Sequence, residues 1–139
     1  AVSNVKVPKI TLNVGASFGA GNYAMCGKAY EPDFIFSWPN AKIGVMGGEQ
    51  AAKTMEQVMI SSAGRKGSNI DETKLKSQLT EITEKYNSQS DAFVTSGRGL
   101  DYGLINPIDT RKILGFLLET FWESKHRATK PNSFGIARM

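Results

Sequence analysis

The chain has 139 residues, of which 40% are hydrophobic and 22% charged, as is typical of a globular domain able to bury a core. The formal net charge of +4 is scattered and forms no basic stripe with aromatic residues, so nucleic acid is not an expected partner. No apolar run is long enough to span a bilayer, and we expect no membrane partner. The single cysteine, Cys26, rules out an internal disulfide and suits a reducing compartment.

The first half of the chain predicts short strands and helices in alternation. Residues 9–14 alternate and are β-branched, which predicts a strand, and a glycine-rich turn leads into a short helix over 22–27. Residues 34–38 form a short apolar run, 42–46 predict a second strand, and a helix begins at Glu49. The residues expected to face the core are Met25, Cys26, Ala51, Ala52, Met55, Val58 and Met59.

The second half predicts two helices. A narrow apolar stripe over 71–86 predicts a surface helix, and 87–91 predicts a loop. Residues 100–105 predict a short strand, and a helix with a wide apolar face runs from Asn106 to about residue 123, with Pro107 in its first turn. The basic stretch 124–130 predicts a solvated tail, with a polyanion such as a CoA phosphate as the alternative. Together these elements predict α/β layering.

The stretch VGASFGAGNY, residues 14–23, supports two chemical interpretations. It contains the G-x-S-x-G pattern of a serine hydrolase, for which Ser17 would be the nucleophile, with Asp101 or Asp109 and then His126 as partners. This hypothesis is weak because His126 is the one histidine and lies in a polar stretch, and because Asp109 already suits a helix cap. We therefore expect Ser17 to shape the turn and not to attack a substrate.

The second interpretation concerns the backbone of the same stretch. A strand that ends in glycines and feeds a helix directs free N–H groups towards one point, where they stabilise an anion. Small residues also keep side chains away from the ligand. On these physical grounds alone, a glycine-rich turn that binds nothing remains an open alternative.

Longer motifs add a resemblance to a known family. Residues 15–52, GASFGAGNYAMCGKAYEPDFIFSWPNAKIGVMGGEQAA, closely resemble the carboxyltransferase (β) subunits of biotin-dependent acyl-CoA carboxylases, and most nearly those of the methylcrotonoyl-CoA carboxylases. The segments INPIDTRKILG at 105–115 and FGIARM at 134–139 resemble the same family. The resemblance implies a crotonase-like (ClpP/crotonase) α/β fold, a spiral of ββα repeats. It also implies that residues 1–139 are a C-terminal fragment, part of the second of two such domains.

The family resemblance also implies a reaction. A carboxyl group moves from carboxybiotin to 3-methylcrotonoyl-CoA, a step of leucine degradation, and the backbone N–H groups of Ala20 and Gly21 form the oxyanion hole for the biotin enolate. Substrate-binding positions fall on Phe18, Gly19 and Tyr23. Two further glycines either lie near biotin or form a structural turn, namely Gly47 and Gly48. The alternatives are geranyl-CoA or another acyl-CoA carboxylase or decarboxylase, and a non-catalytic crotonase-fold interaction domain.

The resemblance implies cofactors and partners as well. Biotin would be carried by the partner's carrier domain, an acyl-CoA would be the substrate, ATP would act only at the partner subunit, and no metal is expected. The expected partners are other carboxyltransferase subunits, in a hexamer built from dimers, and the α subunit that holds biotin carboxylase and the biotin carrier. The expected location is the bacterial cytoplasm or the mitochondrial matrix, and the isolated chain is expected to be inactive.

Overall fold

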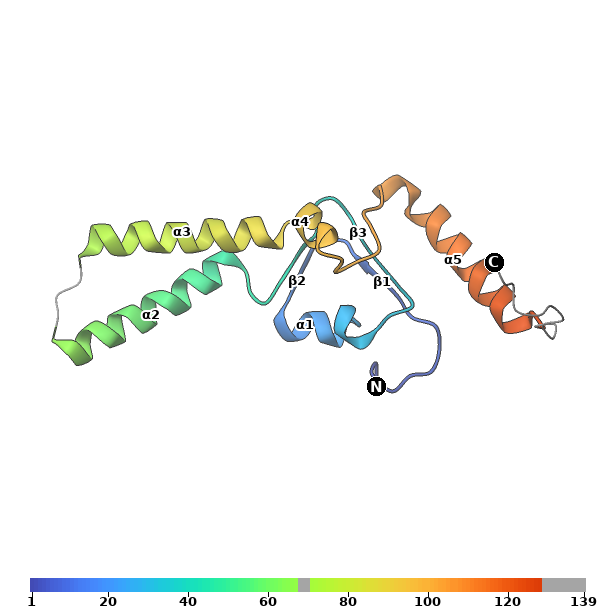
Figure 1. Ribbon diagram of the computed structural model, residues 1–139, viewed down its shortest axis with the longest axis horizontal. Coiled ribbons are helices and arrows are strands. Elements are labelled where there is room, and N and C mark those ends of the chain that lie inside the picture. Colours follow the sequence, from blue (N-terminus) through green and yellow to red (C-terminus); the bar gives the residue numbers. More distant parts are fainter. Residues whose placement is uncertain (68–70, 129–139) are drawn as a thin grey trace, which may run out of the picture. The chain divides into compact units, whose positions relative to one another are not determined.

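The computed structural model describes residues 1–67 and 71–128, and divides the chain into a unit Ala1–Pro107 and a second unit that begins at Ile108 (Figure 1). The two units are described separately below. Sequence features that lie outside the described residues include FGIARM and Lys130, the end of the basic stretch. None of the described helices is both long and apolar enough to cross a membrane.

Two pairs of short parallel strands form the centre of the first unit. Strand β1 (Ile10–Asn13) pairs with β3 (Phe34–Ser37), and β2 (Ala16–Phe18) pairs with β4 (Lys42–Gly44). Parallel strands need a crossover connection, which the short helix α1 (Gly19–Ala24) and the turn η1 (Lys28–Tyr30) help to supply. The best buried side chains of this centre are Ile35, Ser37 and Ala41, all 2% exposed or less.

Strand β2 was not predicted from the sequence, which indicated only a glycine-rich turn. Ser17 lies opposite Ile43 of β4, so the turn residues 16–18 extend the parallel pairing before the helix begins. Helix α1 consequently starts at Gly19, three residues before the predicted start. Met25 was wrongly expected in the core, because it follows this helix and is 75% exposed, whereas Cys26 is buried as expected.

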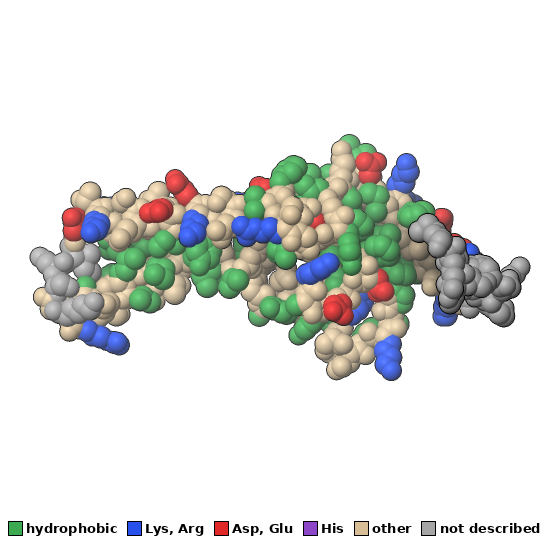
Figure 2. Space-filling view, in the orientation of Figure 1, with side chains coloured by type: hydrophobic (Ala, Val, Ile, Leu, Met, Phe, Trp, Pro, Cys, Tyr) green, Lys and Arg blue, Asp and Glu red, His purple; other side chains and the backbone are tan. Residues whose placement is uncertain are grey.

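Helices α2 (Gly48–Lys66) and α3 (Glu72–Ser90) lie side by side and form a hairpin (Figure 1). Asp71 caps α3, since its carboxylate accepts hydrogen bonds from the N–H groups of Thr73 and Lys74. Of the residues of α3 only Ser90 is buried, in agreement with the predicted surface helix. Figure 2 shows hydrophobic side chains gathered along this hairpin, where Met55 and Val58 were expected to be buried but are 39% and 55% exposed.

The predicted loop 87–91 is wrong, because α3 continues through it to Ser90. Asp91 then serves as the N-cap of a further helix, α4 (Ala92–Gly97), by accepting a hydrogen bond from the N–H of Phe93. Ser90, at the junction, lies against the backbone of Gly44 in β4. Packing against the strand therefore maintains a helix that the weak helix propensity of residues 87–90 does not predict.

The strand predicted for 100–105 is also wrong, since this segment makes only an isolated bridge between Leu104 and Ser37. A buried polar chain holds it in place. Asn13 Nδ2 donates to Ser37 Oγ over 3.2 Å, and Ser37 Oγ donates to Asp101 Oδ2 over 2.6 Å. Asp101 Oδ1 also accepts from the N–H of Gly103. These bonds connect β1, β3 and the 101–103 turn without a regular strand.

The second unit consists of helix α5 (Thr110–His126), which the turn η2 (Pro107–Asp109) precedes. The helix confirms the element predicted from residue 106 onwards. Asp109 takes the N-cap position of α5, without a capping hydrogen bond from its side chain. Of the α5 residues only Leu117 is buried, while Phe116 and Trp122 are 67% and 66% exposed.

Candidate functional site

The corner between β2 and α1 carries the residues that the sequence placed in an oxyanion hole. The strand ends at Phe18 and the helix begins at the next residue, so the chain turns sharply there. Gly19 makes this turn with a φ of +55°, and a Cβ at this position would lie 3.1 Å from the carbonyl oxygen of Val45. Only glycine adopts this backbone conformation without strain, so Gly19 is required by the corner itself.

The N–H groups of Ala20 and Gly21 have no acceptor among the described residues. Both belong to the first turn of α1, where the N–H groups lack a carbonyl four residues earlier. The N-cap residue, Phe18, offers no side-chain oxygen that could accept them. Both residues are exposed, so the two donors are available to an external acceptor.

Gly21 differs from Gly19 in its surroundings. A Cβ built on Gly21 would meet no atom within 4 Å, and its φ is not in the left-handed region. Neither packing nor backbone conformation therefore requires glycine at this position. A ligand that approaches the backbone closely would require it, which is the interpretation that the resemblance gave.

The positions to which the resemblance assigned substrate binding, Phe18, Gly19 and Tyr23, lie at this corner or in the helix that follows it. The Phe18 ring lies close to the backbone of β4, since a Cβ added at Gly44 would be 3.4 Å from it. Tyr23 is 50% exposed and makes an edge contact with Tyr30, with ring centroids 5.7 Å apart. Gly19 and Tyr23 both line a hollow of about 540 Å³, whereas Ala20 and Gly21 lie outside its lining.

This first hollow is mostly apolar, with three polar side chains. Lys28 belongs to it and also lies over the ring of Tyr102, 4.2 Å from the ring centroid. The walls of the hollow come from segments far apart in the chain, so no local sequence pattern indicates it. Its remaining lining residues are Asn13, Asn22, Ala29, Ile35, Ile43, Gly44, Val45 and Leu100.

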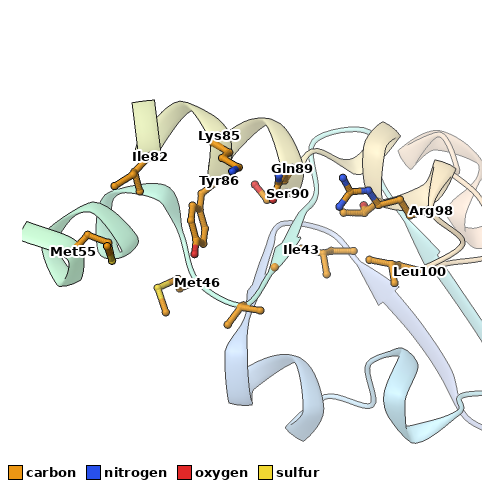
Figure 3. Close-up of a pocket in the computed structure, with 13 residues that line it drawn as sticks. Ile43, Met46, Met55, Ile82, Lys85, Tyr86, Gln89, Ser90, Arg98 and Leu100 are labelled. Carbon is orange, nitrogen blue, oxygen red and sulfur yellow. The ribbon is translucent and has the colours of Figure 1, made fainter. Parts of the chain in front are cut away.

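A second hollow, also of about 540 Å³, lies where α2, α3 and α4 meet the end of β4 (Figure 3). It shares Ile43, Gly44, Val45 and Leu100 with the first hollow. Its wall combines apolar side chains with polar groups. Besides the four shared residues, the lining of the second hollow includes Met46, Met55, Ile82, Lys85, Tyr86, Gln89 and Arg98. Sequence periodicity assigned Ile82 and Tyr86 to a helix stripe but gave no sign that this stripe borders a cavity.

Gly47 is the N-cap of α2 and Gly48 is its first residue. Neither glycine lines the first or the second hollow. Gly48 is buried, and a Cβ there would lie 2.6 Å from the carbonyl oxygen of Thr83 and 2.7 Å from Asn87 Oδ1. This contact requires glycine for the packing of α2 on α3 and favours the structural interpretation of Gly48. A Cβ on Gly47 would lie 3.8 Å from the Phe18 ring, an ordinary contact.

The groups considered for a serine hydrolase are engaged elsewhere. Ser17 Oγ accepts a hydrogen bond from Asn22 Nδ2, and Asp101 is bonded to Ser37 and Gly103. His126 belongs to α5 in the second unit, where its Nδ1 lies 2.7 Å from the carbonyl oxygen of Trp122. Nothing in this arrangement supports a nucleophilic Ser17. The described ranges also contain no group of three or more His, Cys, Asp or Glu side chains that could hold a metal ion.

Comparison with known proteins identifies the family of the chain. The carboxyl transferase domain model matches residues 1–134, and the chain belongs to this family. It is 45% identical over 139 residues to the β chain of mitochondrial methylcrotonoyl-CoA carboxylase of Arabidopsis thaliana. The matched region covers 100% of this chain and 23% of the relative. The chain thus spans about a quarter of the length of the curated relatives it matches.

Solved structures similar to the chain include two carboxyltransferase subunits. The β subunit of geranyl-CoA carboxylase of P. aeruginosa is 44% identical, with a TM-score of 0.86, over 99% of this chain and 26% of that one. Transcarboxylase 12S, solved as a hexamer assembly with methylmalonyl-CoA bound, is 29% identical with a TM-score of 0.67, over 97% of this chain and 24% of that one. These similarities confirm the crotonase-like carboxyltransferase fold expected from the sequence.

Proposed function

We propose that this chain is part of the carboxyltransferase component of a biotin-dependent acyl-CoA carboxylase. In this role it moves a carboxyl group from carboxybiotin to an acyl-CoA, with 3-methylcrotonoyl-CoA as the proposed acceptor. The observation that carries the proposal is that the N–H groups of two exposed residues, Ala20 and Gly21, have no acceptor among the described residues. The name of the Arabidopsis relative supports the acceptor.

The residues of the corner fit the chemistry of biotin. Bound carboxybiotin would supply the carboxyl group, its ureido oxygen would carry negative charge once that group had left, and its ureido nitrogen would take the proton that the acyl-CoA loses. Ala20 and Gly21 present two neighbouring donors to such an oxygen, and the open space beside Gly21 admits it. In other enzymes one such donor stabilises a transition state by about 3–4 kcal/mol. Ala20 and Gly21 are thus the proposed catalytic residues, and no side-chain base from this corner is needed.

The other predicted positions have supporting roles in this proposal. Phe18 lies against Gly44 and Gly47 and so forms a fixed wall beside the donors. Gly19 orients the N–H groups of Ala20 and Gly21 through its left-handed backbone conformation. Tyr23 lines the first hollow, where the acyl group would lie. Gly47 remains a proposed neighbour of biotin, while the packing around Gly48 supports a structural role for that residue.

Geranyl-CoA is a second candidate acceptor, because the geranyl-CoA carboxylase β subunit superposes with a TM-score of 0.86. The test is to assay the full-length subunit with a biotin carboxylase partner, ATP, bicarbonate and a panel of acyl-CoAs. Carboxylation of 3-methylcrotonoyl-CoA at the highest kcat/KM is the expected result. Preference for geranyl-CoA would replace the acceptor, and carboxylation of no acyl-CoA in the panel would favour a non-catalytic interaction domain.

The proposed partners follow from the same relatives. The transcarboxylase 12S hexamer supports assembly with further carboxyltransferase subunits. An α subunit would provide biotin on its carrier domain and would be the site at which ATP is used. The Arabidopsis relative is mitochondrial and P. aeruginosa is a bacterium, which supports the mitochondrial matrix and the bacterial cytoplasm as the proposed locations.

A further inference from the structure

A side-chain hydrogen bond closes the corner that carries the two donors. Asn22 Nδ2 donates to Ser17 Oγ over 3.0 Å. The two residues are five positions apart, and the backbone between them contains Gly19, Ala20 and Gly21. The bond therefore joins β2 to α1 across the segment from which the free N–H groups project. We refer to it as the Ser17–Asn22 clip.

Other contacts fix the far end of α1 but not its start. The carbonyl oxygen of Asn22 accepts from the N–H of Gly27 over 2.7 Å, and Thr11 Oγ1 donates to the carbonyl oxygen of Cys26 over 2.8 Å. Gly27 is buried and has no room for a Cβ, because Asn22 occupies that space. Asn22 is thus held on one side by Gly27 and reaches Ser17 on the other.

The start of α1 lacks the usual means of fixation. The helix has six residues, its N-cap Phe18 makes no side-chain hydrogen bond, and its first turn contains no acidic residue. A helix this short has little stability of its own. Among the side-chain hydrogen bonds recorded for residues 17–24, the clip is the one that crosses from α1 to the preceding strand.

We propose that Asn22 is a positioning residue, which acts through Ser17 to hold the N–H groups of Ala20 and Gly21 at the spacing required for the biotin oxygen. This inference rests on the proposed function. Its physical basis is that preorganised donors stabilise developing charge only when they are already aimed at it, and a displacement of about 1 Å costs roughly 100-fold in rate. The inference explains the presence of a serine in the turn without a nucleophilic role.

The test compares Ser17→Ala, Asn22→Ala and the double variant in the full-length subunit assayed with its biotin carboxylase partner. Ser17→Ala is expected to lower kcat by about 10- to 100-fold with an unchanged KM for acyl-CoA. Asn22→Ala is compared by kcat alone, because Asn22 also lines the first hollow, and should show a similar loss. The double variant should have the kcat of the more impaired single variant. Ser17→Thr retains the hydroxyl and should keep wild-type kcat. An unchanged kcat in Ser17→Ala, independent effects that multiply, or a change confined to KM would each overturn the proposal.

Hydrogen exchange provides a readout that does not depend on activity. Loss of the clip is expected to speed exchange of the Met25 amide, which donates to the Gly21 carbonyl oxygen in the first turn of α1, about fivefold in Ser17→Ala relative to wild type and Ser17→Thr. Equal exchange in all three proteins would refute the clip. This readout is independent of the proposed function, which would be refuted instead by a subunit that carboxylates no acyl-CoA. Ser17→Ala also decides the matter should Asn22→Ala fail to fold, since alanine is readily accommodated at a half-buried strand position.

Discussion

At the scale of single residues, glycines of the same corner serve different purposes. Gly19 is required by its backbone, with φ at +55° and the Val45 carbonyl 3.1 Å from the space of a Cβ. Gly21 has neither constraint. The structure thereby separates a glycine needed for folding from one that we assign to ligand approach, a distinction that the sequence GAG could not provide.

Alanine at these two positions should have opposite effects on stability. We expect Gly19→Ala to lower the free energy of unfolding by about 1–2 kcal/mol, because a left-handed conformation strains a residue with a Cβ. Gly21→Ala should leave it unchanged or raise it by up to about 1 kcal/mol, since alanine favours helix. Denaturant titration of both variants measures the difference. Equal destabilisation by the two substitutions would contradict the assigned geometry.

At the scale of elements, the packing of α2 on α3 depends on the absence of a side chain at Gly48. The Thr83 carbonyl and the Asn87 side chain occupy the space that a Cβ would need. Gly64 lies in the same helix, is exposed and has no atom within 4 Å of that space. The two glycines provide a matched pair within one helix.

Gly48→Ala is expected to destabilise the protein by about 1–3 kcal/mol, because the new methyl group must push α2 away from α3. Gly64→Ala should stabilise it by up to about 1 kcal/mol through helix propensity. Thermal unfolding of both variants tests this. If Gly48→Ala unfolded at the wild-type temperature, the close contact with Thr83 would be wrong.

The buried hydrogen-bond network of Asn13, Ser37 and Asp101 is a second feature at the scale of elements. Asp101→Ala should lower stability by about 1–3 kcal/mol, because the buried Ser37 hydroxyl would lose its acceptor. Glu84→Ala, on the exposed surface of α3, is the control and should change stability by less than about 0.5 kcal/mol. Denaturation midpoints of the two variants report the difference, and equal midpoints would show that the network contributes nothing.

Helices and strands that depend on neighbouring residues could be predicted from the sequence, whereas those that depend on residues far away in the chain could not. Helices α2, α3 and α5 have periodic apolar residues that are visible in the sequence, and α3 also has Asp71 as its N-cap. Strand β2 has three residues between Gly15 and Gly19, and exists because β4 pairs with it from some 25 residues away. The bond between Ser37 and Asp101 joins residues 64 positions apart, which no local pattern reveals.

The candidate site was predictable for a different reason. Its residues came from a specific motif and a family resemblance, and physical reasoning alone left a turn without a ligand as an open alternative. What the sequence could not supply was the three-dimensional setting: the Phe18 ring against Gly44, the clip from Asn22 to Ser17, and the hollow beside Tyr23. Each of these joins separate elements or depends on a side-chain orientation.

At the scale of the whole molecule, large apolar side chains are exposed in both units. Met25 and Val45 in the first unit are 75% and 77% exposed, and Ile108 in the second is 88% exposed. Exposed apolar side chains mark contact sites for other protein segments where they gather into a contiguous patch. Their exposure is compatible with the proposed assembly with further carboxyltransferase subunits.

The isolated 139-residue chain is therefore expected to show no measurable carboxylation of 3-methylcrotonoyl-CoA, even with a biotin carboxylase partner present. The full-length subunit, assayed in parallel at equal concentration, is the control and should be active. Turnover by the isolated chain at a rate comparable to the full-length subunit would show that no other domain contributes to the site.

The central claim is that two backbone N–H groups hold the biotin oxygen, and the rate of carboxyl transfer by Gly21→Pro tests it most directly. Proline removes one donor at a first-turn position where no intrahelical bond is lost. Gln50→Pro places proline at the equivalent third position of α2, a helix that also lacks a side-chain cap, and controls for proline itself. We predict that Gly21→Pro lowers the rate by about 100-fold or more while Gln50→Pro retains it. Transfer by a folded Gly21→Pro protein at the wild-type rate would contradict the account.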